Sequence, residues 1–282
     1  STPIWIAVLD LDREDRRQIA RSASGEAPGR PILPFQPVSL RGFANWQQHW
    51  QDAARVLTRR HLGPAWAAIA AYERLTRRTF PALKPGKQFY QHPAYYHGNP
   101  LNTVVDGDEL PWPAYTKELD FELEIGFLLT RRVRDATPAQ ARAAIGGCVL
   151  FNDLSARDVQ WDEHRHGLFG PVVKAKSFGN AMSATVVCAD DVVDRVAELS
   201  ATVTVNGDIW SRPSTRGMRY TPAQMLAWAS RGETLHPGEL LTSGTLPGGS
   251  GLELDRWLRP GDVLTLHVDQ IGSLTNTVGQ PA

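Results

Sequence analysis

The chain has 282 residues, of which 42% are hydrophobic, enough to bury a sizeable core in one or two domains. The 30 basic and 30 acidic residues cancel to a formal net charge of zero, so no electrostatic footprint points to nucleic acid or an anionic membrane as a partner. The 2 cysteines lie in apolar runs, which argues against a disulfide framework and favours a reducing compartment.

Residues 1–38 are expected to form a short N-terminal segment. A strand is predicted over residues 4–9 and a helix over residues 12–21, followed by an irregular stretch rich in Ser, Gly and Pro. The opening run STPIWIAVLD has no preceding basic residues and soon meets acidic ones, which fits neither a signal peptide nor a membrane span. We therefore predict a cytoplasmic protein whose main domain covers residues 39–282.

Two helices are predicted at the start of this domain. Apolar residues at helical spacing indicate the first, from Phe43 to about His61, and Pro64 starts the second, which runs through Thr76. His49 lies within the first helix, among tryptophans. By itself, a histidine in such surroundings is more often a packed core side chain than a catalytic one.

The segment KELDFELEIGFLL, which begins at Lys117, alternates apolar and polar residues and predicts a half-buried strand. Its acids, Asp120, Glu122 and Glu124, therefore share one face. On an isolated strand such a face is most often a solvated outer surface, and two ionised carboxylates brought together repel unless a cation or a proton intervenes.

A second segment changes this interpretation. The apolar run GCVLF ends abruptly at Asn152 and Asp153, which places a further acid at the mouth of a buried strand. Carboxylate oxygens are the ligands that a hard cation such as Mg²⁺ prefers. Glu122, Glu124 and Asp153 therefore form a candidate cation site, with the cationic Arg157 and Lys176 nearby in the sequence.

Local signals indicate further elements. Thr137 and Thr221, each followed by proline, are expected to cap short helices. The first is predicted over Ala139 to Ala144, with Gly146 as its stop signal. Asn206-Gly207 predicts a tight hairpin turn between two strands. The segment WDEHRHGLFGPVVK, residues 161–174, is polar and contains Gly and Pro, which suits a mobile lid.

Histidines outside the first helix offer weaker metal interpretations. His164 and His166, with Glu163, allow a zinc site, but no further His or Cys follows at a zinc-site spacing. His92 and His97 lie near prolines and are interpreted as turn or surface residues, because an oxygen-rich site needs no histidine.

The motifs ELDFELEIGF, FNDLSARDVQ, KSFG, HPGELLTSGT and RPGDVL, in this order, resemble the fumarylacetoacetate hydrolase family from about Ser39 to Val278. The resemblance implies an α+β, predominantly β fold: a mixed β-roll with flanking helices, commonly dimeric. It also implies Mg²⁺, or Mn²⁺ or Ca²⁺, at the mouth of the roll, and a small dicarbonyl or other oxo acid as substrate.

The resemblance also implies roles for individual residues. His49 would be the general base and Glu253, otherwise a default surface acid, would orient it. Lys176 would stabilise an enolate, although it could instead be a structural partner of one of the acids. The remaining implied roles are metal binding by Glu122, Glu124 and Asp153, and substrate binding by Arg157, Gln160, Tyr96, His164 and Thr245.

One position departs from the family pattern. Gly42 stands where members usually have an acidic metal ligand, so the metal would either keep an extra water or bind less tightly.

The resulting prediction is a metal-dependent hydrolase that cleaves a carbon–carbon bond in an acylpyruvate-like acid, with water activated by His49 attacking a metal-chelated diketone. The alternatives are a 2-oxo acid decarboxylase, hydratase or isomerase, and a non-catalytic small-molecule binder. The presence of both His49 and Glu253 favours hydrolysis.

Overall fold

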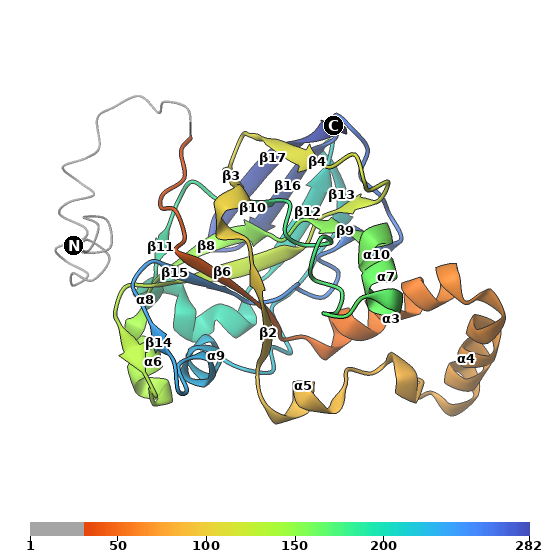
Figure 1. Cartoon of the computed structure of the whole chain (residues 1–282), viewed down its shortest axis with the longest axis horizontal. Coiled ribbons are helices and arrows are strands. Elements are labelled where there is room, and N and C mark those ends of the chain that lie inside the picture. The colour runs from red at the N-terminus through yellow and green to blue at the C-terminus, as the bar shows by residue number, and fades with distance from the viewer. Residues whose placement is uncertain (1–30) are drawn as a thin grey trace.

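The computed structural model describes residues 31–282, so the strand and helix predicted before residue 22, and all but the end of the segment 1–38, lie outside the described residues. Two large β-sheets form the body of the described part, with helices around them (Figure 1). No helix within residues 31–282 is long and apolar enough to cross a membrane.

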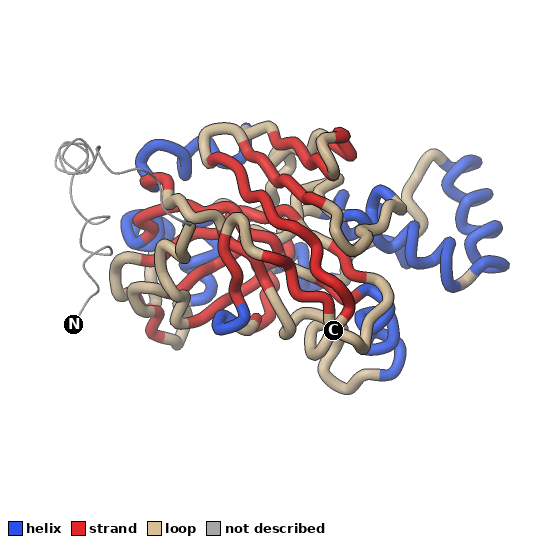
Figure 2. Tube along the Cα trace, turned by 90° about the horizontal axis from the view of Figure 1, so that it is seen from above, coloured by secondary structure: helices blue, strands red, loops and turns tan. Residues whose placement is uncertain are grey.

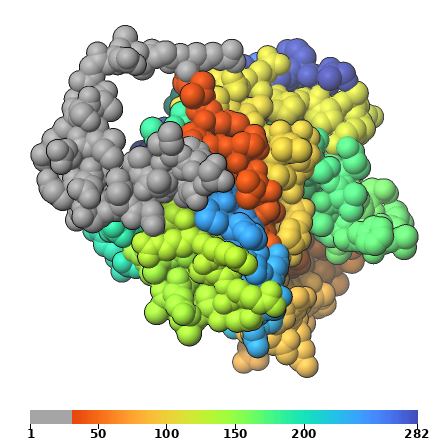
Figure 3. Space-filling view, turned by 60° about the vertical axis from the view of Figure 1, so that its left-hand side comes forward, coloured from red at the N-terminus to blue at the C-terminus, as the bar shows by residue number. Residues whose placement is uncertain are grey.

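The larger sheet has 8 strands in the order β2-β1-β15-β6-β8-β10-β3, with β11 also paired to β8. The strands are β1 (Ser39–Ala44), β2 (Ala94–Gly98), β3 (Thr103–Val105), β6 (Leu123–Leu129), β8 (Ile145–Asn152), β10 (Asn180–Met182), β11 (Val187–Cys188) and β15 (Glu239–Thr242). Strand β1 pairs parallel to β15 and antiparallel to β2. Figure 3 shows this start of the described chain, in red, between the light-blue and yellow-orange segments that carry those partners.

The second sheet has 5 strands in the order β13-β12-β16-β17-β4. They are β4 (Glu109–Trp112), β12 (Ala201–Val205), β13 (Asp208–Ser211), β16 (Val263–Val268) and β17 (Gly272–Pro281). The predicted hairpin is confirmed, because β12 and β13 pair antiparallel around Asn206 and Gly207. Both turn residues have positive φ, 54° and 83°, as a type I′ turn requires.

The acidic segment differs from the single half-buried strand that its alternation predicts. It is divided into β5 (Leu119–Asp120), which pairs with β9 (Ser155–Ala156), and β6, while Glu122 between them forms an isolated bridge to Ser250. The expectation of a half-buried strand is wrong, since β6 is buried at every position. The physical reason is that apolar clusters cover both faces of the larger sheet. A further two-stranded pair joins β7 (Val133–Arg134) to β14 (Thr234–Leu235).

The helices lie around the sheets. They are α3 (Gln47–His61), α4 (Gly63–Thr76), α5 (Lys87–Gln91), α6 (Pro138–Ala144), α7 (Arg157–His166), α8 (Ala189–Val192), α9 (Pro222–Ala229) and α10 (Gly251–Leu254). Three 3₁₀ turns are η1 (Pro81–Leu83), η2 (Pro100–Asn102) and η3 (Val193–Glu198). Figure 1 and Figure 2 show that α4 projects from one end of the molecule, beyond α3.

The start of the first predicted helix is corrected by the structure. Helix α3 begins at Gln47 instead of Phe43, because β1 continues to Ala44, where it still pairs with β2. The capped helices α6 and α9 are confirmed, each with a threonine capping box, and α6 ends at Ala144 as predicted. Gly146 is not a separate stop, because the chain enters β8 directly after Ala144. The first part of the predicted lid, residues 161–166, is helical because it belongs to α7.

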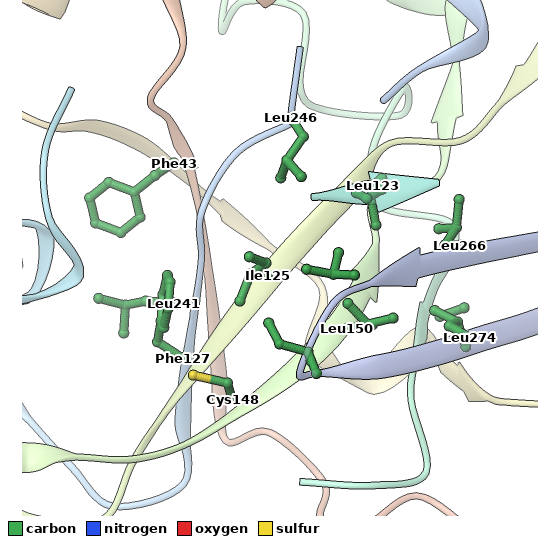
Figure 4. Close-up of a cluster of buried hydrophobic side chains, with 14 of the residues drawn as sticks. Phe43, Leu123, Ile125, Phe127, Cys148, Leu150, Leu241, Leu246, Leu266 and Leu274 are labelled. Carbon is green, nitrogen blue, oxygen red and sulfur yellow. The ribbon is translucent and has the colours of Figure 1, made fainter. Parts of the chain in front are cut away.

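The main core joins the two sheets. Figure 4 shows Leu123, Ile125 and Leu150 of the larger sheet facing Leu266 and Leu274 of the smaller one, and all five are buried. Such packing of apolar side chains contributes about 25 cal/mol for each Å² removed from water. The core therefore fixes the positions of β6 and β8, and the acids of interest lie at the ends of these two strands.

Candidate active site

The three carboxyl groups predicted to bind a cation come together. Glu122, Glu124 and Asp153 each offer an oxygen within 4.8 Å of the others, and their exposed fractions are 6%, 2% and 2%. The pairing of β6 with β8 sets Leu123 opposite Asn152. Asp153 follows Asn152 and therefore lies beside Glu122, which precedes Leu123. The backbone N–H of Asp153 donates to the Glu122 carbonyl over 3.1 Å. Strand pairing therefore builds the cluster.

Two buried cations contact this cluster. Lys176 donates from Nζ to Glu122 Oε2 over 2.6 Å and to Asp153 Oδ2 over 2.9 Å. Arg157 donates from Nη2 to Glu122 Oε1 over 2.7 Å and from Nε to Asp120 Oδ2 over 2.8 Å. Three buried carboxyl groups, those of Asp120, Glu122 and Asp153, thus share two cations.

The carboxyl groups respond differently to this environment. Burial would raise the pKa of Glu122, but Lys176 and Arg157 outweigh burial and hold it far below its usual range. Burial, with the charges of Asp153 and Glu122, raises the pKa of Glu124 well above normal. Burial also raises the pKa of Asp153, despite Lys176. The carboxylates repel one another, and a further positive charge at the cluster would relieve that repulsion.

The cluster fits a hard divalent cation. Asp153 Oδ1 is buried without a hydrogen-bond partner in the described part of the chain, so a ligand oxygen is available. The donors are all carboxylate oxygens, which Mg²⁺, Mn²⁺ and Ca²⁺ accept. Within residues 31–282 these three acids are the one group of His, Cys, Asp or Glu side chains that is arranged to hold a metal ion.

His49 and Glu253 also come together, although they are far apart in the sequence. His49 Nδ1 lies 2.8 Å from Glu253 Oε2, because α3 packs against α10. Glu253 is held in place by the Gly248 N–H at 3.0 Å and the Ser250 hydroxyl at 2.9 Å. Burial lowers the pKa of His49, but the charges of Glu253 and then Glu122 outweigh it and raise that pKa overall.

The predicted substrate-binding residues have diverse positions. The Tyr96 hydroxyl, expected to face a ligand, donates instead to Asp153 Oδ2 over 2.7 Å. Gln160 accepts from Arg157 Nη1 over 2.7 Å and donates to the Pro171 carbonyl. Thr245 is buried and follows Gly244, whose N–H donates to Glu124 Oε2 over 3.2 Å.

His164 is not part of this buried group. It is exposed on α7, and its ring lies 5.9 Å from that of Trp161. The zinc interpretation of this segment is not supported, because Glu163 accepts backbone N–H groups of residues 173–175 and His166 lies 2.9 Å from Asp162. His92 stacks on Trp228 with ring centroids 4.1 Å apart.

Sequence reasoning gave Asp120 no role of its own, but it links the two halves of the site. It is fully buried, binds Arg157 and accepts the N–H groups of Gly251 and Leu252 over 2.9 and 3.0 Å. Those two residues begin α10, the helix that carries Glu253. The only sequence signal for Asp120 was the regular D-x-E-x-E spacing. This spacing does not show which of the three acids binds a metal and which has a structural role.

Comparison with known proteins places these features in context. The profile of the family described as Fumarylacetoacetate (FAA) hydrolase C-terminal matches residues 65–279. An oxaloacetate tautomerase of Xenopus laevis, named as mitochondrial, is 26% identical over 189 residues. That match covers 67% of this chain and 58% of the relative, so the chain spans little more than half of the relative's length.

Solved structures share the fold. The fumarylacetoacetate hydrolase of the psychrophilic bacterium Exiguobacterium antarcticum is 25% identical, with a TM-score of 0.64 over 88% of this chain and 77% of that one. The fumarylpyruvate hydrolase of Pseudomonas aeruginosa, solved with Mn²⁺ and pyruvate, has a TM-score of 0.63 at 19% identity, over 90% and 98% of the two chains. The predicted α+β, β-rich fold is thereby confirmed.

Proposed function

Because the chain belongs to the fumarylacetoacetate hydrolase family, we propose that it is a metal-dependent hydrolase that cleaves a carbon–carbon bond in a small β-dicarbonyl acid such as an acylpyruvate. The observation that carries this proposal is the partly buried His49–Glu253 pair, with Nδ1 and Oε2 2.8 Å apart. The charges of Glu122 and Arg157 also act on His49. In this proposal the histidine is the base that serves the acidic cluster.

Glu122, Glu124 and Asp153 would hold Mg²⁺, or Mn²⁺ or Ca²⁺, which when bound would polarise a substrate carbonyl. The chain's own residues supply the proton chemistry. With Nδ1 turned to Glu253, the Nε2 atom of neutral His49 is left to take a proton from water. The resulting hydroxide attacks the distal carbonyl carbon, and Glu253 stabilises the imidazolium.

Cleavage of the carbon–carbon bond follows the attack. The bond between the attacked carbonyl carbon and the neighbouring carbon breaks, its electron pair passes into an enolate, and His49 returns the proton to that fragment. The products are one carboxylic acid and one 2-oxo acid. Lys176 would stabilise the enolate charge. Arg157, Gln160, Tyr96, His164 and Thr245 are the proposed contacts for substrate oxygens.

A second candidate is isomerase or tautomerase chemistry on a 2-oxo acid such as oxaloacetate. It is favoured by the similarity to the Xenopus oxaloacetate tautomerase. Moving a proton between carbon and oxygen needs a base and a polarised carbonyl but no attacking water. The same residues could serve it, so only products distinguish the two activities.

The test is an assay of wild type and His49→Ala with acylpyruvates and oxaloacetate, in Mg²⁺ and in EDTA. We expect Mg²⁺-dependent loss of the diketone absorbance and a fall of roughly 10²- to 10⁴-fold in the variant, the usual share of a general base. His267→Ala is the matched control, because His267 is a partly exposed residue of β16 that contacts Ser273.

Other outcomes separate the alternatives. Tautomerisation of oxaloacetate without diketone cleavage would replace the hydrolase with an isomerase, and CO₂ release that survives His49→Ala would indicate a decarboxylase. Binding of an oxo acid without turnover would indicate a non-catalytic binder.

We further propose that residues 39–282 form one catalytic domain, that the protein acts as a homodimer in the cytoplasm, and that nucleic acid is not a partner. Light scattering coupled to gel filtration tests the dimer.

A further inference from the structure

Gly42 of β1 has a specific steric role. It lies opposite Tyr96 of β2, and a Cβ added to Gly42 would lie 2.4 Å from Tyr96 Cε1. Gly42 is not among the glycines with positive φ, so its backbone does not demand glycine. What demands it is the space that the phenol ring fills.

The seated phenol contacts the acidic cluster. Its hydroxyl donates to Asp153 Oδ2 over 2.7 Å, and Lys176 Nζ donates to the same oxygen over 2.9 Å. The other oxygen, Oδ1, is buried without a hydrogen-bond partner among the described residues. Two donors on one oxygen fix the rotation of the carboxylate and leave its second oxygen available.

The phenol keeps its proton in this position. A phenol has an ordinary pKa of about 10 and is therefore protonated at neutral pH. A protonated hydroxyl beside a carboxylate donates to it. The interaction is therefore a charge-assisted hydrogen bond, which is shorter and stronger than a neutral one.

We infer that Tyr96 is a positioning residue for the cation site, and that Gly42 acts by giving its ring room: the hydroxyl holds Asp153 by Oδ2 and so presents Oδ1 to the ion. This inference rests on the cation site of the proposed function. It revises the expectation that Gly42 merely removes a ligand, because an acidic side chain at residue 42 would displace the phenol before it could add an oxygen.

The experiment is calorimetric titration of Mn²⁺ into metal-free full-length protein: wild type, Tyr96→Phe, Gly42→Ala and the double variant. Partners that orient metal ligands typically contribute 10- to 100-fold in affinity, so we expect Tyr96→Phe to weaken Mn²⁺ binding roughly tenfold. Gly42→Ala should have a similar effect. In the double variant the two losses of Mn²⁺ affinity should not multiply. Tyr96→Phe has already removed the hydroxyl contact, so Gly42→Ala has nothing further to disturb.

Gly98→Ala is the matched control. Gly98 lies on β2, the strand of Tyr96, and its added Cβ would clash with the Leu40 side chain at 2.7 Å but would lie 3.6 Å from Tyr96 Cε2, an ordinary contact distance. Thermal unfolding of the metal-free proteins measures any general damage, and we expect Gly98→Ala to leave the Mn²⁺ affinity unchanged.

The outcomes are distinguishable. Wild type that binds no Mn²⁺ overturns the cation site and this inference with it. Wild-type affinity in Tyr96→Phe overturns the positioning role alone. Losses that multiply in the double variant show that Gly42 does not act through Tyr96.

Discussion

Replacing Asp120 by Asn should destabilise the protein far more than its single lost charge suggests. Asp120 Oδ1 accepts the N–H groups of Phe121 and Gly251, both over 2.9 Å. Oδ2 accepts Arg157 Nε over 2.8 Å and the Leu252 N–H over 3.0 Å. Whichever way the new amide turns, its NH₂ group faces two donors.

The magnitude follows from this geometry. Two hydrogen bonds to a charged acceptor are lost, each contributing about 1.5 to 3 kcal/mol, and the Arg157 guanidinium loses one of its two buried carboxylates. Breaking a buried ion pair costs about 3 to 5 kcal/mol. The first route gives a loss of about 3 to 6 kcal/mol and the second about 3 to 5 kcal/mol in the free energy of unfolding. Either is a large share of the total of about 5 to 15 kcal/mol that is usual for a domain.

Urea denaturation at pH 7 measures this loss as a lower midpoint at unchanged slope. The control is Asp255→Asn, since Asp255 also binds an arginine, Arg59, over 2.6 Å, but both side chains are more than a third exposed, at 42% and 48%. An exposed pair contributes about 1 kcal/mol or less. A loss in Asp120→Asn no larger than in this control would refute the reasoning.

Two further predictions concern the site. Mg²⁺ at about 100 times its dissociation constant should stabilise the EDTA-treated protein by about 2.7 kcal/mol, seen as a higher melting temperature; the absence of any shift, or a shift retained in Asp153→Asn, would contradict cation binding by the cluster. In Glu253→Gln the pKa of His49 should fall, because the charge of Glu253 raises it against burial. The rising limb of the rate profile, where His49 must lose its proton, then moves to lower pH. For stability, a raised histidine pKa contributes fully below the ordinary value of 6.5 and is lost as the pH rises through the folded value. The stability difference between wild type and Glu253→Gln should therefore shrink from pH 6 to alkaline pH, and a difference that grows would refute the pairing.

Local signals in the sequence determined several elements correctly. The Asn206-Gly207 turn and the threonine caps of α6 and α9 depend on contacts between residues a few positions apart. The sequence also located the acid that follows β8, because the apolar run of this strand stops just before Asn152 and Asp153. The start of α3 was mispredicted because Phe43 is held in a strand by β2, a partner about fifty residues away.

Only the tertiary structure decided how the acids are used. Alternation of apolar and polar residues shows which side chains share a face of a strand, but not whether that face meets water or a second layer. Glu122 and Glu124 are buried because the larger sheet is covered on both faces. Asp120 became the anchor of α10, and Tyr96 a partner of Asp153, through the register of segments far apart in the chain. Register across such distances results from packing of the whole domain, and no local pattern of residues contains it.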